Sequence, residues 1–201
     1  MNEHEVKSCL LCGVGGQGTV LASRIIAAAA MNRGLSARTA ETIGMAQRGG
    51  SVVSHVRIGH SIASPTIPKG RADVLLGFEP GETAACLDYL KPGGTVIVCQ
   101  KEITPVTAAL GLSGYRGGSC LEYMLAHTEK CYIIDGDSIC EACGSPKVLN
   151  VAAAGALCAC GEMGLDPEDF REALRQRLKP ALLDMNLLAF SLGMEAVQTQ
   201  E

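Results

Sequence analysis

A glycine-rich segment near the N-terminus has the spacing of a phosphate-binding turn. It reads Gly13-Val14-Gly15-Gly16-Gln17-Gly18 and satisfies G-x-G-x-x-G between an apolar, strand-like run and a stretch from Thr19 to Asn32 that lacks Gly and Pro. Glycines at these positions permit a tight turn and let backbone N–H groups approach an anion, and the N-terminus of the next helix favours negative charge. The segment predicts a site for a phosphate-bearing ligand. The alternative is a turn that only lets the helix pack on the strand.

A second glycine-bounded segment lies between two predicted strands. Its sequence is Gly44-Met45-Ala46-Gln47-Arg48-Gly49-Gly50-Ser51. Exposed backbone N–H groups, the Arg48 guanidinium and the Gln47 amide could together surround an anion or a carbonyl group. A solvated turn with a surface arginine is the simpler alternative.

Two carboxylates and one histidine are further candidates for chemistry. Glu79 follows a buried strand, at the edge of an open α/β sheet where ligands bind, so it could contact a partner or substrate or cap the turn at Gly81. Glu41, near the end of the second predicted strand, stands roughly where a ribose-binding acid would, which keeps a nicotinamide or flavin cofactor as an alternative. His55 lies alone in a strand, and such a histidine is more often packed than catalytic.

The chain has ten cysteines, including two C-x-x-C pairs. Cys9 and Cys12 lie in a predicted strand, where alternating side chains point to opposite faces, so these thiols should diverge. Cys140 and Cys143 lie nearly one helical turn apart and stay open as candidates for a metal or redox role. Otherwise we interpret the thiols as small buried hydrophobic groups, and no bound metal is expected.

The order of predicted elements indicates an α/β fold with a mostly parallel sheet and a C-terminal helical extension. Residues 36–42 are predicted to form a second strand that completes a βαβ unit with the first. Further strands are expected over 51–58, 73–78, 95–99 and 130–135, with helices over 82–90 and 119–127. From Lys147 onward the pattern is helical throughout, so we divide the chain into a domain over 1–146 and an extension over 147–201 packed on it.

Composition narrows the classes of function. The chain has 201 residues, a formal net charge of −4 and only 3% aromatic residues, so it lacks the basic surface and stacking platforms of a nucleic-acid binder. Its longest apolar runs fall short of the roughly 20 residues that span a bilayer, so we expect no membrane segment. The N-terminus does not have the pattern of a signal peptide, which predicts a cytoplasmic protein.

Four stretches carry a family resemblance: the glycine-rich segment at 13–18, the run from Gly44 to Arg57, Ala72-Asp73-Val74-Leu75-Leu76-Gly77-Phe78-Glu79-Pro80, and Tyr89-Leu90-Lys91-Pro92-Gly93-Gly94. Together they resemble the gamma-type domain of 2-oxoacid:ferredoxin oxidoreductases, in particular the beta subunits of its indolepyruvate branch. Asn150, Gly155-Ala156 and the tail from Asn186 to Gly193 are also similar, whereas 111–143 matches least. The resemblance implies a Rossmann-like three-layer fold.

The same resemblance implies a subunit, inactive alone, of a complex that oxidatively decarboxylates an aryl 2-oxoacid to the acyl-CoA. Thiamine diphosphate and the iron–sulfur clusters would reside on a large alpha-type partner subunit, and electrons would pass to ferredoxin. The resemblance implies contacts to the CoA, the substrate or the partner from the glycine segment (Gly13, Gly15, Gly16, Gln17, Gly18), from Met45 to Gly50 and from Glu79. Arg48 would be an anion contact, and no residue of this chain would be catalytic. The absence of a nucleophile elbow, H-E-x-x-H or P-loop motif fits this division. A homodimer of the isolated chain is a further expectation.

Two alternatives remain at this point. One is a standalone NAD(P)- or flavin-linked oxidoreductase. The other is an assembly module without an active-site role.

Overall fold

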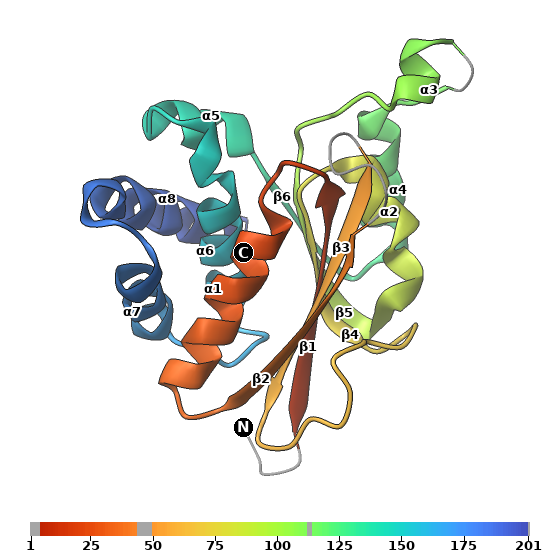
Figure 1. Cartoon of the computed structure of the whole chain (residues 1–201). Helices are drawn as coiled ribbons and strands as arrows, with labels where there is room; N and C mark the ends of the chain where they lie inside the picture. The colour runs from red at the N-terminus through yellow and green to blue at the C-terminus, as the bar shows by residue number, and fades with distance from the viewer. Residues whose placement is uncertain (1–4, 44–49, 112–113, 201) are drawn as a thin grey trace.

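One six-stranded sheet forms the centre of the molecule, in the order β2-β3-β1-β4-β5-β6 (Figure 1). The computed structural model describes residues 5–43, 50–111 and 114–200. The pairs β1–β4, β4–β5 and β5–β6 are parallel, and β3 is antiparallel to both of its neighbours. The predicted α/β fold with a mostly parallel sheet is therefore confirmed. The strands are β1 Val6–Val14, β2 Ser36–Ile43, β3 Ser51–Gly59, β4 Ala72–Gly77, β5 Leu90–Cys99 and β6 Lys130–Ile134.

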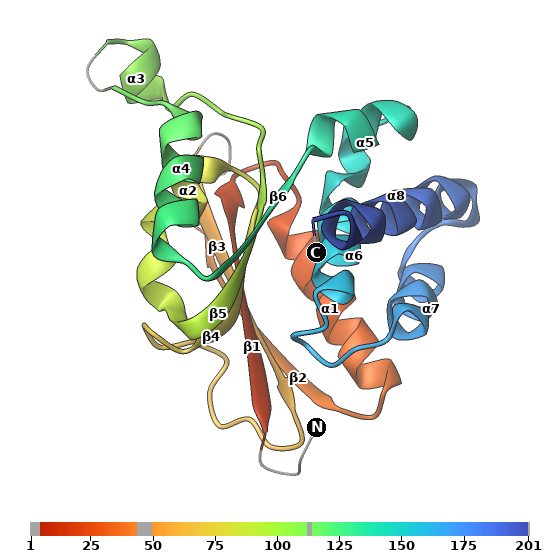
Figure 2. The ribbon, with the colours of Figure 1, turned by 180° about the vertical axis from the view of Figure 1, so that it is seen from behind.

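Helices cover both faces of the sheet and make three layers. Figures 1 and 2 show α1, α5, α6, α7 and α8 on one face and α2 and α4 on the other. The helices are α1 Thr19–Asn32, α2 Pro80–Ala85, α3 Val106–Ala109, α4 Gly117–His127, α5 Gly136–Ala142, α6 Leu149–Ala159, α7 Pro167–Arg177 and α8 Pro180–Gln198, with short 3-10 turns η1 Leu87–Tyr89 and η2 Pro146–Val148. The predicted run of C-terminal helices is present, and its separation from the rest at residue 146 stays a prediction.

The alternation of side chains along β1 builds two hydrophobic clusters, one on each side of the sheet. Cys9 and Leu11 are buried beneath α1 and α6, whereas Leu10 and Cys12 are buried on the side of α2 and α4. The prediction that the Cys9 and Cys12 thiols diverge is confirmed. β4, beside β1 in the middle of the sheet, is buried along its whole length, as the apolar run from Val74 to Phe78 predicts.

Helix α1 ends in the manner its sequence predicts. Gly34 has φ +79° and donates its N–H to the Met31 carbonyl at 3.0 Å, while Leu35 N–H bonds the Ala30 carbonyl at 3.0 Å. This pair of bonds is the Schellman arrangement, in which a left-handed glycine closes the last turn. It directs the chain back along the sheet into β2.

Helices α6 and α8 approach each other closely because each carries a glycine at the crossing. A β-carbon on Gly155 would lie 2.1 Å from the Phe190 carbonyl oxygen, and one on Gly193 would lie 1.9 Å from that of Ala152. Backbone atoms cannot yield to such a group. The two glycines, which carried part of the family resemblance, thus let α8 lie on α6 and bury its apolar side.

Among the described residues, α8 is the one helix with the length and hydropathy to cross a membrane. It has 19 residues with a mean hydropathy of 1.2, and 28% of the tested stretch is buried. Length and composition alone are weak evidence, since a core helix passes the same test. Here Asn186 and Gly193 on this helix are buried in the fold.

Two expectations about local structure are wrong. β2 does not pair with β1, because β3 lies between them and pairs with both in antiparallel register. The helix expected over 82–90 begins at Pro80 and ends at Ala85, followed by η1. A proline suits the first helical turn, where its missing N–H needs no partner, so the helix starts earlier than the glycine at position 81 suggested.

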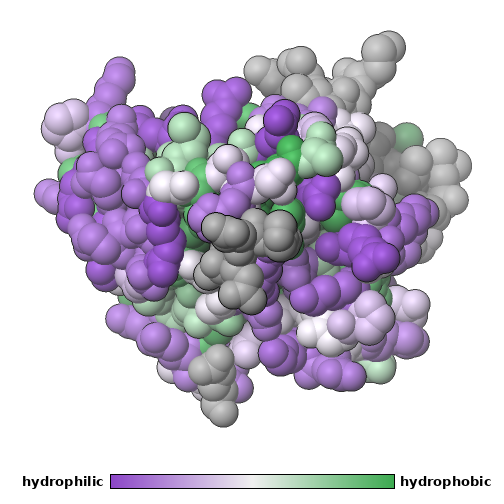
Figure 3. All heavy atoms as spheres, turned by 90° about the horizontal axis from the view of Figure 1, so that it is seen from below, coloured by the Kyte–Doolittle hydropathy of each residue, from purple (hydrophilic) through white to green (hydrophobic). Residues whose placement is uncertain are grey.

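The two ends of the sheet differ in character. β1, β4, β5 and β6 all have their carboxyl ends at the end where α1 begins (Figure 1). Figure 3 views the opposite end, which is largely hydrophilic with hydrophobic residues in small separate patches. At the outer edge, the Gln200 side chain accepts from Ile133 N–H at 3.1 Å and donates to the Ile133 carbonyl at 2.8 Å, so the end of the chain covers part of strand β6.

Candidate functional site

The glycine-rich segment joins β1 to α1 at the carboxyl edge of the sheet, in the context that G-x-G-x-x-G requires. Gly16 and Gly18 have φ of +106° and +83°, which side chains rarely adopt. Gly13 needs its lack of a side chain for another reason: a β-carbon there would lie 2.8 Å from Gln17 Oε1 and 3.0 Å from Phe78 Cβ. The turn therefore presents the N-terminus of α1 at the surface of the sheet edge.

Gln17 connects the ends of the two central strands. Its Oε1 accepts from Val14 N–H at 2.7 Å, and its Nε2 donates to the Phe78 carbonyl at 2.8 Å. Val14 is the last residue of β1, and Phe78 directly follows β4. The Gln17 amide, which the family resemblance places among the contacts to CoA, substrate or partner, thus has two backbone partners within the chain.

The second glycine-bounded segment ends beside the first. The Gly50 carbonyl accepts from Gly15 N–H at 2.9 Å, so the two segments meet at this point. Met45, Gln47, Arg48 and Gly49 lie outside the described residues. Their predicted roles, including that of Arg48 as an anion contact, stay predictions.

Glu79 is the N-cap residue of α2. Its Oε2 accepts from Glu82 N–H at 2.8 Å, and its Oε1 accepts from the Tyr115 hydroxyl. The side chain is buried, and burial together with the Glu79 carboxylate raises the pKa of Tyr115. Of the two roles considered for Glu79, capping is confirmed, and a contact to partner or substrate stays a prediction.

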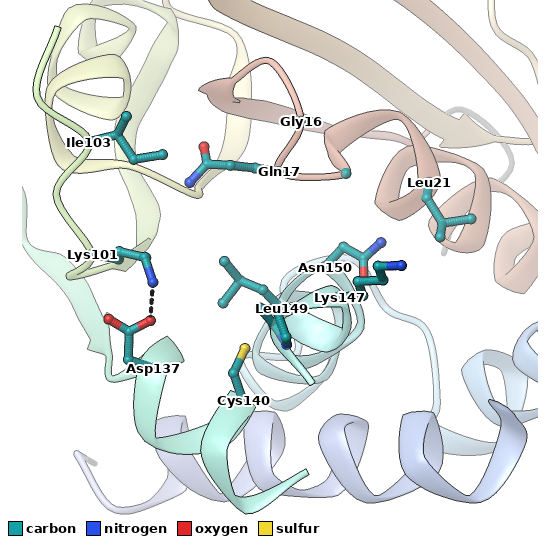
Figure 4. A pocket seen from close by; sticks show the side chains of 12 residues that line it. Gly16, Gln17, Leu21, Lys101, Ile103, Asp137, Cys140, Lys147, Leu149 and Asn150 are labelled. Carbon is teal, nitrogen blue, oxygen red and sulfur yellow. Dashed lines mark hydrogen bonds and ion pairs between the residues drawn. The ribbon is translucent and has the colours of Figure 1, made fainter. Parts of the chain in front are cut away.

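A pocket of about 510 Å³ opens between the glycine turn and the start of α6 (Figure 4). Two lysines reach it: Lys101, which follows β5 and forms an ion pair with Asp137, and Lys147, which precedes α6. Apolar side chains of Leu21, Ile103 and Leu149 contribute to its wall. The pocket thus combines a helix N-terminus, the Lys147 ammonium group, the Lys101–Asp137 ion pair and apolar surface, which suits an anionic ligand with apolar parts.

Asn150 contributes an unsatisfied polar atom to this pocket. The residue is 5% exposed, lines the pocket beside Gly18, and its Oδ1 has no hydrogen-bond partner. A buried acceptor without a donor costs roughly 1–3 kcal/mol, so Asn150 is a candidate for contact with a bound ligand or water. Asn150 was not predicted as a site residue, although it is the one polar side chain in the run Val148-Leu149-Asn150-Val151-Ala152-Ala153-Ala154, which could have marked it.

One of the described cysteines, Cys140, lines the pocket. It lies on α5, and burial raises the pKa of its thiol, which favours the protonated form. Cys143 is half-buried on the next turn, and burial raises its pKa as well. Within the part of the chain that the structure describes, His, Cys, Asp and Glu do not gather in groups of three that could hold a metal ion.

Glu41 and His55 lie away from the pocket. Glu41 is on β2, and β3 separates that strand from β1, so the carboxylate is not positioned as the dinucleotide alternative requires. His55 is buried and its Nδ1 accepts from Ile67 N–H at 3.1 Å, which anchors the connection from β3 to β4. The interpretation of His55 as a packed histidine is confirmed.

An open α/β sheet with a glycine turn at its carboxyl edge is typical of proteins that bind phosphorylated ligands at that edge. Residues 8–196 match the family described as pyruvate ferredoxin/flavodoxin oxidoreductase, and the chain belongs to this family. It is a small subunit of a 2-oxoacid:ferredoxin oxidoreductase, an enzyme assembled from several subunits. The alternative of a standalone NAD(P)- or flavin-linked enzyme is not supported.

Relatives agree over nearly the whole chain. The indolepyruvate oxidoreductase subunit IorB of Thermococcus kodakarensis is 34% identical over 203 residues, which cover 98% of each chain. A keto/oxoacid ferredoxin oxidoreductase gamma subunit from Geobacter sulfurreducens has the same fold, with a TM-score of 0.71 and 23% identity over 96% of this chain and 99% of that one. The 2-oxoglutarate:ferredoxin oxidoreductase of Magnetococcus marinus, solved with 2-oxoglutarate, coenzyme A and succinyl-CoA, gives a TM-score of 0.72 and 20% identity over 98% of this chain and 32% of that one.

Proposed function

We propose that this chain supplies the CoA pocket of a complex that oxidatively decarboxylates an aryl 2-oxoacid, with indolepyruvate as the preferred substrate. The acyl group passes to CoA, and electrons leave to ferredoxin through a large alpha-type partner subunit. The indolepyruvate preference rests on the name of the relative from Thermococcus kodakarensis. We place the complex in the cytoplasm and expect the isolated chain to form a homodimer.

The observation that carries the proposal is the meeting of the α1 N-terminus, Lys147 and the unsatisfied Asn150 oxygen in one pocket. CoA offers matching groups: a diphosphate for the helix N-terminus and the lysines, and N–H donors on its adenine and pantetheine parts for Asn150. Because Oδ1 itself is covered, a ligand reaches it after a small rotation of the amide. A pocket of about 510 Å³ accommodates part of CoA and leaves its thiol end free to extend toward the partner.

Binding and orientation are the tasks of this chain in the reaction. The helix N-terminus and two lysines fix the anionic part of CoA, and this fixed position directs the thiol end to the reacting centre. Thiamine diphosphate would supply the decarboxylation chemistry on the partner, which would also hold the iron–sulfur clusters. A solved neighbour of the same fold that carries CoA and succinyl-CoA supports the proposal at the level of the fold.

Co-expression with the large subunit tests the activity directly. The purified complex should reduce a redox dye, or ferredoxin, with indolepyruvate in the presence of CoA, and more slowly with phenylpyruvate or pyruvate. Equal or greater rates with pyruvate would refute the aryl preference. A complex that is active without CoA and makes no acyl-CoA would refute the proposed role of this chain.

Lys147→Gln tests the pocket. Loss of one charge-assisted contact to phosphate should raise the KM for CoA about tenfold, which corresponds to about 1.4 kcal/mol, and leave the KM for indolepyruvate unchanged. Lys179→Gln is the matched control, because Lys179 is exposed just before α8 and does not line the pocket. If both variants have the wild-type KM for CoA, the pocket is not the CoA site.

A further inference from the structure

Two polar side chains at the carboxyl edge of the sheet, Gln17 and Glu79, form hydrogen bonds with neighbouring protein groups at that edge. Gln17 and Glu79 were both expected to contact ligand or partner, yet each has protein partners for both of its terminal polar atoms. We propose that Gln17 and Glu79 are positioning residues, which together hold the glycine turn in its ligand-binding shape. This inference rests on the proposed function in that the pocket beside the turn is taken as the CoA site.

Gln17 is suited to this role by its position within the turn that it stabilises. Its side chain folds back to bond Val14 N–H and crosses to the Phe78 carbonyl, so one amide fixes the turn against both central strands. A β-carbon on Gly13 would lie only 2.8 Å from Gln17 Oε1, so the Gln17 side chain packs directly against the backbone of the turn. Gly16 and Gly18, which present their backbone to the pocket, flank Gln17 directly.

Glu79 extends the same arrangement to a third segment. The Phe78 carbonyl that accepts from Gln17 belongs to the peptide unit that leads into Glu79, and the Glu79 carboxylate accepts from the Tyr115 hydroxyl and Glu82 N–H. A continuous path of bonds therefore runs from Tyr115, before α4, through residues 78 and 79 to the end of β1. A change at Tyr115 should reach the glycine turn although the Tyr115 and Gln17 side chains share no bond.

Hydrogen exchange of the full chain without ligand tests the positioning role. Gln17→Met keeps a side chain of similar length and removes both bonds, so amides of residues 13–19, including Gly15 N–H, should exchange about tenfold faster. Tyr115→Phe should give a smaller increase in the same amides. The double variant should show less than the product of the two increases, because both changes loosen one bonded arrangement.

CoA titration of the reconstituted complex completes the test. The Gln17→Met complex should bind CoA about tenfold more weakly. Gln17→Glu keeps the bond to Val14 N–H, so residues 13–19 should lose less protection from exchange in this variant. It also serves as the second variant if Gln17→Met does not fold. Weaker CoA binding with unchanged exchange would show that Gln17 contacts CoA directly, and effects of Gln17 and Tyr115 that simply multiply would show that the two residues act independently. Either result would overturn the inference. Faster exchange with unchanged CoA affinity would overturn it as well.

The proposed function fails separately from this inference. If the wild-type complex does not bind CoA, the proposed function is wrong, and exchange in the glycine turn still shows whether Gln17 and Glu79 hold its shape. If the wild-type complex binds CoA and the Gln17 variants match it in both measurements, only the positioning role is wrong.

Discussion

Asn150→Leu should make the isolated chain more stable and the complex a poorer CoA binder. Leucine has nearly the shape of asparagine, so the change removes the unpaired Oδ1 with little change in packing beside Gly18. An unsatisfied buried acceptor costs roughly 1–3 kcal/mol, and we expect a gain of about 1–2 kcal/mol in the free energy of unfolding. For a chain of this length that gain corresponds to a rise in Tm of roughly 2–8 °C.

Urea and thermal unfolding of the isolated chain give the stability, and calorimetric titration of the complex gives the Kd for CoA, which should rise about tenfold. Asn186→Leu is the matched control: Asn186 is equally buried, but its Nδ2 donates to the Leu182 carbonyl at 2.7 Å and it lies outside the pocket. That variant should keep the wild-type Kd for CoA. A loss of stability in Asn150→Leu, or an unchanged Kd, would refute the reasoning, because Asn150 would then hold the fold and not a ligand.

Two further predictions concern the fold. Burial lowers the pKa of His55 below its ordinary 6.5, so the unfolded chain binds more protons, and the free energy of unfolding should fall as pH drops from about 6.5 toward 5. Urea titrations at several pH values should show this slope. His55→Gln should flatten the slope, whereas His60→Gln, at an exposed site, should leave it unchanged. Gly193→Ala should cost about 3 kcal/mol in urea unfolding because its methyl group would meet the Ala152 backbone. Gly118→Ala on α4, where a β-carbon would have open space, should cost nothing, and equal costs would refute the close helix crossing.

Local patterns predicted most of the elements. The boundaries of α1 and the glycine that closes its last turn follow from residue preferences that act within a few positions. The place of β3 between β1 and β2 was missed because strand order depends on pairing between segments distant in sequence. Alternation along β3 shows which face is buried, and it carries no information on the neighbouring strand.

The site was predicted in part. The glycine spacing located the turn, and the cap role of Glu79 was one of two roles considered. The Gln17 amide donates to the Phe78 carbonyl, 61 positions away in the sequence, so the glycine spacing could not indicate this hydrogen bond. Asn150 and Lys147 were missed because α6 reaches the glycine turn only through the folding of the C-terminal helices onto the sheet.

The contact between Gln200 and strand β6 bears on how the protein can be handled and assembled. One glutamine amide takes the place of a peptide unit against Ile133, so the outermost strand does not present this N–H and carbonyl to another chain. Removing the last residues, or fusing a tag that pulls them away, would leave that strand free to recruit a strand from a second molecule. Purification tags are therefore better placed at the start of the chain, where they leave the Gln200–Ile133 contact intact.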